Sequence, residues 1–157
     1  MYSKVRKGTA FRVYLPAFKI DIYEAGEQEP EVLVGDGEWI LVVEDEESIR
    51  DVTFLILEMS GYKVLTANDG AEAIALYAEN MDMIKVILMD MMMPVMDGHT
   101  SIRGIRRINN EVKIIAVSGL AEKDKLAKIA DLANAFLPKR YSAVKLLKTI
   151  HEVISAR

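Results

Sequence analysis

The chain has 157 residues, of which 51% are hydrophobic and 28% are charged, and its net charge is −4. This balance is typical of a folded globular protein and excludes an intrinsically disordered one. A mildly acidic domain lacks the clustered lysine and arginine that neutralise phosphates, so we expect no nucleic-acid binding. The chain has no cysteine, which excludes disulfides and thiol catalysis, and no apolar run reaches the length of a membrane span. We expect a cytoplasmic protein without direct membrane contact.

Two short strands and a linker are predicted in the first part of the chain. Apolar and polar residues alternate over 11–15 and 18–22, with a break at Pro16. The segment EAGEQEPEVLVGDGE at 24–38 combines acidic residues with Gly and Pro and has no sustained periodicity, which is typical of a linker. The predicted organisation is a β arm at 1–23, a linker at 24–38 and a domain at 39–157.

The predicted domain alternates strands with helices. The expected strands are 40–43, 63–66, 86–89, 113–117 and 135–137, and the expected helices are 48–60, 70–79, 100–108, 122–132 and 142–154. Five βα units in alternation predict an α/β fold, with a doubly wound parallel sheet and helices on both faces. Three of the strands are apolar throughout, as expected of strands that are covered on both sides.

Polar residues mark the carboxyl ends of these strands, where such sheets bind ligands. Glu44 and Asp45 follow the first strand, Asp90 ends the third, Ser118 ends the fourth and Lys139 follows the fifth. Three carboxylates at one edge repel each other and resist ionisation unless a cation offsets them. A divalent metal and the ammonium of Lys139 can both supply that charge. One acidic residue at a strand end is usually a turn former, but five polar residues at the same edge indicate a site.

Four segments of the domain resemble the receiver domain of response regulators, the phosphate-accepting module of two-component signalling. The segments are ILVVEDEESIR, VILMDMMMPVMDG, IIAVSG and FLPK, in the family's order and at family-like spacings. The resemblance covers 39–155 and implies a flavodoxin-like sheet with strand order 2-1-3-4-5. It also implies a partner, either a histidine kinase or a histidine phosphotransfer protein, that donates a phosphoryl group.

The resemblance implies a role for each of the matching residues at the strand ends. Asp90 would be the phosphoacceptor. Asp45 and Asp90 would bind Mg²⁺ directly, together with the backbone carbonyl of Met92, while Glu44 would act mostly through water. Lys139 would pair with Asp90 and later with the phosphoryl oxygens.

The resemblance also implies a switch. Ser118 would hydrogen-bond the phosphoryl group, and its inward shift would draw the aromatic ring of Phe136 inward. Where the family usually has Lys-Pro with a cis peptide bond, this chain has Lys139-Arg140. A cis bond is costly without proline, so we expect a trans bond here.

The segment SKVRKGTAFRVYLP at 3–16 resembles the end of the ATP-binding domain of histidine kinases. The resemblance implies that the chain is the C-terminal part of a hybrid sensor histidine kinase, whose nucleotide-binding motifs would lie upstream. The predicted strands of the arm have unpaired edges, which favour pairing with each other, docking on the receiver or exchange with a second copy. A homodimer through the arm is therefore possible, and the resemblance to receiver domains implies a second contact face, formed by 122–132, 135–137 and 142–154.

Two other functions remain open at this point. A pseudo-receiver that takes no phosphoryl group would signal by protein contacts alone. A Mg²⁺-dependent phosphohydrolase would use an aspartyl nucleophile, but that class needs a second carboxylate two residues further on, and this position is Met92.

Overall fold

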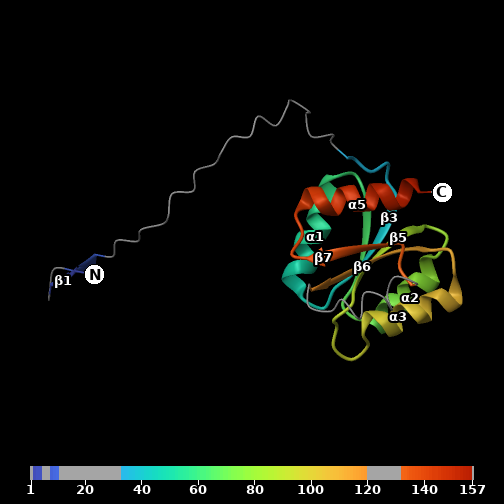
Figure 1. The fold of residues 1–157 in the computed structure, drawn as a ribbon, viewed down its shortest axis with the longest axis horizontal. Coiled ribbons are helices and arrows are strands. Elements are labelled where there is room, and N and C mark those ends of the chain that lie inside the picture. The colour runs from blue at the N-terminus through green and yellow to red at the C-terminus, as the bar shows by residue number, and fades with distance from the viewer. Residues whose placement is uncertain (1, 5–7, 11–32, 120–131, 157) are drawn as a thin grey trace. The chain divides into compact units, whose positions relative to one another are not determined.

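The computed structural model describes residues 2–4, 8–10, 33–119 and 132–156 (Figure 1). The chain divides into two compact units, Met1–Glu31 and Val32–Arg157. In the first unit, β1 (Tyr2–Lys4) pairs with β2 (Gly8–Ala10) in antiparallel register. The predicted strands at 11–15 and 18–22 and the predicted helix at 122–132 lie outside the described residues.

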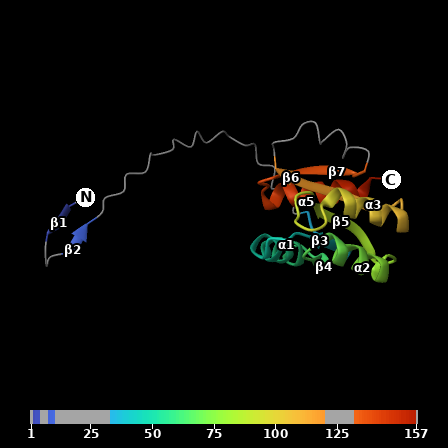
Figure 2. The same cartoon turned by 90° about the horizontal axis from the view of Figure 1, so that it is seen from below.

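A five-stranded parallel sheet forms the centre of the second unit. Its strands are β3 (Trp39–Val43), β4 (Lys63–Ala67), β5 (Ile84–Asp90), β6 (Lys113–Gly119) and β7 (Ala135–Lys139). They lie in the order β4-β3-β5-β6-β7, which Figure 2 shows from one edge of the sheet to the other. This is the 2-1-3-4-5 order, so the predicted fold class is confirmed. The connections change direction between β3 and β5, which places the ligand-binding crevice of such folds at the carboxyl ends of these two strands.

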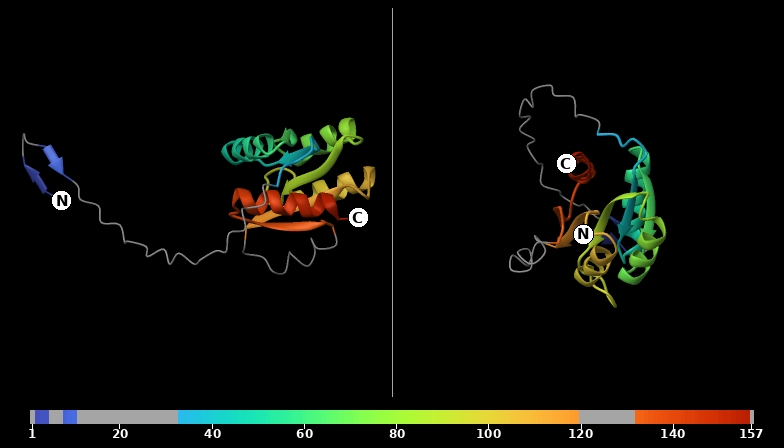
Figure 3. Two further views of the ribbon diagram at one scale, coloured as in Figure 1. Left: turned by 90° about the horizontal axis from the view of Figure 1, so that it is seen from above. Right: turned by 90° about the vertical axis from the view of Figure 1, so that its right-hand side faces the viewer.

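Helices cover both faces of the sheet. They are α1 (Glu47–Met59), α2 (Gly70–Asn80), α3 (Gly98–Ile108) and α5 (Ala143–Ser155). The α1 and α5 helices pack on one face and α2 and α3 on the other (Figures 1 and 3). Because side chains alternate along a strand, β3 sends Leu41 toward α2 and α3 and Val42 toward α1 and α5. Both are buried, as expected of a strand covered on both sides. Within the described residues, no helix is both long and apolar enough to span a membrane.

The last part of the predicted linker runs beside the turn between α1 and β4. The N–H of Gly35 donates to the carbonyl of Ser60 at 2.7 Å, and the N–H of Gly37 donates to the carbonyl of Gly61 at 3.1 Å. A Cβ atom on Gly35 would lie 2.5 Å from the ring of Tyr62, so only glycine fits this approach. The backbone from 33 to 38 is therefore part of the packed unit.

Candidate functional site

Three carboxylates meet at the carboxyl edge of the sheet. Glu44 follows β3 directly, Asp45 comes next and Asp90 is the last residue of β5. Each carboxylate offers an oxygen that lies within 4.8 Å of the other two. Val43 pairs with Met89 in the parallel register, and this pairing brings the ends of the two strands together. Glu44 and Asp90 are 4% and 2% exposed, whereas Asp45 is exposed to solvent.

Lys139, at the carboxyl end of the outer strand β7, reaches this acidic cluster along the same edge of the sheet. Its Nζ atom lies 2.8 Å from Oδ2 of Asp90 and 2.8 Å from Oε2 of Glu44. The peptide bond from Lys139 to Arg140 is cis. The expected trans bond was therefore wrong, because that expectation used only the intrinsic preference of non-proline bonds and no tertiary contact. The side chain of Lys139 nevertheless lies against the carboxylate predicted for it.

Burial and charge act together on the ionisable groups. Burial raises the pKa of Glu44, and the charge of Asp90 raises it further, although the bond to Lys139 opposes both effects. Burial alone would lower the pKa of Lys139, but its bonds to Asp90 and Glu44 outweigh burial and raise that pKa. Lys139 is thus a cation at neutral pH. One ammonium faces three carboxyl groups, which leaves the cluster suited to a second cation.

The loop after β5 fixes the orientation of Asp90. The N–H of Met92 donates to Oδ1 of Asp90 at 3.0 Å, and Oδ2 is the oxygen that Lys139 contacts. Gly98, where α3 begins, packs against this loop, and a Cβ atom there would overlap the carbonyl oxygen of Asp90. Val95, at the tip of the loop, has a φ of +69°, which is strained for a β-branched residue. Both oxygens of Asp90 are thus held by neighbours.

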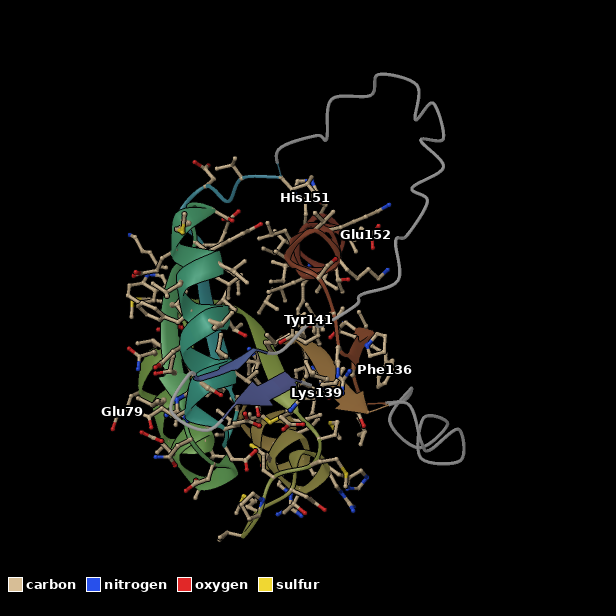
Figure 4. The ribbon with its side chains drawn as sticks, turned by 90° about the vertical axis from the view of Figure 1, so that its left-hand side faces the viewer. Glu79, Phe136, Lys139, Tyr141, His151 and Glu152 are labelled. Carbon is tan, nitrogen blue, oxygen red and sulfur yellow. The ribbon has the colours of Figure 1, made fainter. Side chains whose placement is uncertain are left out.

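Ser118 and Phe136, the predicted switch residues, lie on β6 and β7. Ser118 is half-buried, and its hydroxyl lies 3.4 Å from the carbonyl oxygen of Gly119. Phe136 is half-buried and packs against the core beneath α2 and α3. Figure 4 labels Phe136 and Lys139, which both come from β7. The switch roles of the two residues stay predictions.

The sequence analysis missed Arg50. Its Nη1 atom donates to the carbonyl of Glu44 at 2.8 Å and lies 3.4 Å from the carbonyl of Asp45. Arg50 thereby fixes the backbone of the turn that presents both carboxylates. An arginine in the second turn of a helix after an acidic strand end is only a weak signal, because such arginines are usually solvated.

The comparisons with known proteins agree on the class of the second unit. The family model of the response regulator receiver domain matches residues 40–151. A curated relative, the sensor kinase CckA of Brucella abortus, is 34% identical in an alignment 163 positions long that covers 97% of this chain and 17% of that protein. The chain covers less than half of each of the first curated relatives, with shares of 17%, 45% and 48%.

Solved structures show the same fold. The receiver domain of the sensor histidine kinase PA1611 from Pseudomonas aeruginosa, solved with a magnesium ion in its active-site cleft, is 28% identical with a TM-score of 0.70. That match covers 76% of this chain and 99% of the other. The receiver domain of the hybrid histidine kinase CckA is 29% identical with a TM-score of 0.64, over 74% of this chain and 99% of the other.

Proposed function

The chain belongs to the response-regulator receiver family of two-component signalling, and from this membership we propose that Asp90 accepts a phosphoryl group from a phosphohistidine. The donor would belong to a histidine kinase or a histidine phosphotransfer protein. The observation that carries the proposal is the environment of Asp90. It is a buried carboxylate at the end of β5, with Lys139 on one oxygen, the amide of Met92 on the other, and Glu44 and Asp45 alongside.

The acidic cluster fits a magnesium ion. Carboxylate oxygens are the hard ligands that Mg²⁺ prefers, and one oxygen from each of the three carboxylates lies within 4.8 Å of the others. Asp45 and Asp90 would bind the ion directly, with the backbone carbonyl of Met92, and Glu44 would bind through water. Bound there, Mg²⁺ would neutralise charge on the phosphoryl oxygens.

The residues of the site supply the remaining chemistry. An oxygen of Asp90 forms a bond to phosphorus while the nitrogen–phosphorus bond of the donor breaks, and the freed imidazole takes up a proton. Lys139 passes from Asp90 to a phosphoryl oxygen and keeps the charge balanced. Ser118 hydrogen-bonds the same group, and Phe136 responds by turning inward. Positioning and charge neutralisation are enough for this reaction, because phosphoryl transfer needs little covalent work from the protein.

Intact-mass measurement tests the proposal. After incubation with Mg²⁺ and phosphoramidate, the wild-type chain should gain the mass of one phosphoryl group, and Asp90→Asn should gain none. Asp82→Asn is the matched control, because Asp82 is an exposed acid in a turn away from the cluster. A wild-type chain that binds Mg²⁺ but gains no mass would support the pseudo-receiver. Steady release of phosphate with turnover would support the phosphohydrolase.

We also propose that the chain is the receiver part of a hybrid sensor histidine kinase. The similarity to the sensor kinase CckA supports this, since a match over 97% of the chain extends well before the receiver. Residues 1–23 would then be the end of the ATP-binding domain and 24–38 a linker, whose last part, 33–38, packs with the second unit. The cytoplasmic location and the homodimer, through the arm or through the face that includes β7 and α5, stay predictions.

A further inference from the structure

The turn between β7 and α5 has one residue that packs into the core. Arg140 and Ser142 are exposed, whereas Tyr141 is half-buried and packs against the core beneath α1 and α5. Within the described sheet, β7 is an edge strand, so only β6 holds the backbone of Lys139. Figure 4 shows Tyr141 and Lys139 close together at the end of β7. Tyr141 is therefore placed to fix the backbone from which Lys139 extends.

The hydroxyl of Tyr141 reaches α1. Its oxygen lies 3.4 Å from Oγ1 of Thr53, a residue of α1 that is 3% exposed. This distance is long for a bond between two hydroxyls, so the contact is weak. Burial raises the pKa of Tyr141, and the charge of Glu44 adds to this, while Thr53 and Lys139 oppose it. The hydroxyl thus lies within the electric field of the acidic cluster.

The same helix also holds the opposite side of the site. Arg50, one turn before Thr53, donates to the backbone of the turn that carries Glu44 and Asp45. α1 therefore contacts the turn that carries Glu44 and Asp45 through Arg50, and it contacts the turn between β7 and α5 through Thr53. Through the short contact of Arg50 and the weak contact of Thr53, both turns are attached to the same helix.

We propose that Tyr141 is a positioning residue, which holds Lys139 between Glu44 and Asp90 through its contact with Thr53. A lysine side chain has many rotamers, and fixing its backbone reduces the number that it can reach. The inference rests on the proposed magnesium site, where the ammonium of Lys139 would weaken Mg²⁺ binding because it neutralises two of the same carboxylates, Glu44 and Asp90. When the hydroxyl of Tyr141 is removed, Lys139 should compete less well. Mg²⁺ affinity should then rise, by about twofold to tenfold for one weak hydrogen bond.

Calorimetric titration of the full chain with Mg²⁺ tests this expectation. Tyr141→Phe and Thr53→Val should each bind Mg²⁺ about twofold to tenfold more tightly than the wild type. Thr53→Ser keeps the hydroxyl and should keep the wild-type affinity. In a Lys139→Met background, Tyr141→Phe should cause no further change. A purely structural role predicts the opposite, namely an unchanged or weaker affinity that is the same in both backgrounds, and this result would overturn the proposal.

Unfolding by urea in EDTA gives a second test that needs no metal. Tyr141→Phe should destabilise the wild-type chain more than it destabilises the Lys139→Met chain, because part of its effect acts through Lys139. Tyr62→Phe is the matched control, since Tyr62 is buried in the same core at the other end of α1. Equal losses from Tyr141→Phe in both backgrounds would refute the coupling. If the wild type binds no Mg²⁺, the proposed metal site fails, and the EDTA measurement still decides the role of Tyr141.

Discussion

Replacing Lys139 with Met should destabilise the metal-free domain and make it more responsive to magnesium. The substitution keeps a similar side-chain volume but removes the cation that lies 2.8 Å from both Glu44 and Asp90. These two carboxylates are then buried together without a counter-charge. Removing one partner of a buried ion pair costs about 3–5 kcal/mol. The side chain of Lys139 is 26% exposed, so water offsets part of the loss, and we expect about 2–3 kcal/mol.

Magnesium should restore this stability because it supplies the missing charge. At 100 times its dissociation constant, a ligand that binds only the folded state adds about 2.7 kcal/mol, close to the expected loss. The loss should also shrink at acidic pH. Burial raises the pKa of Glu44 in the folded state above its unfolded-state pKa. The stability that this shift contributes is complete below the unfolded-state pKa and is lost as the pH rises through the folded-state pKa.

Urea unfolding, followed by the fluorescence of Trp39, measures these effects with EDTA or with Mg²⁺. Trp39 is the single tryptophan of the chain and begins β3. Lys148→Met is the matched control, because Lys148 is 61% exposed and its nitrogen lies 3.9 Å from the carboxylate of Glu152. Such a surface pair contributes less than about 0.5 kcal/mol. If Lys139→Met loses no more stability than this control in EDTA, and gains no more from Mg²⁺ than the wild type, the reasoning is refuted.

Three further predictions address the supports of the site. Gly98→Ala should slow phosphorylation and destabilise the domain, because the new methyl group overlaps the carbonyl of Asp90; phosphoramidate labelling and urea unfolding measure the two effects. Arg50→Met should weaken Mg²⁺ binding in calorimetry, since it frees the acidic turn after β3, and an unchanged affinity would argue against that support. Burial raises the pKa of Tyr77, so its stabilising contribution is complete below pH 10 and is lost as the pH rises through the folded-state pKa. Tyr77→Phe loses the hydrogen bond that Asn109 donates to the hydroxyl, so at pH 8 its free energy of unfolding should be about 1 kcal/mol below that of the wild type. Urea unfolding should show this difference becoming smaller by pH 11.

The sequence by itself determined the fold class and which acidic residues share an edge. The run from Val86 to Met89 is apolar and ends at Asp90, and parallel strands share one direction, so Asp90 had to lie on the same edge as Glu44 and Asp45. These features follow from local periodicity and from the direction of the chain. They need no knowledge of how distant side chains meet.

Only the tertiary structure decided how the parts of the site are held together. The bridge from Lys139 to two carboxylates and the contact of Tyr141 with Thr53 both join residues at or just after the end of β7 to elements far away in the sequence. Thr53 and Tyr141 are 88 residues apart, and no sequence pattern around either residue predicts their contact. Periodicity shows which face of an element is buried, but partners across the core are chosen by shape and charge once the elements have packed.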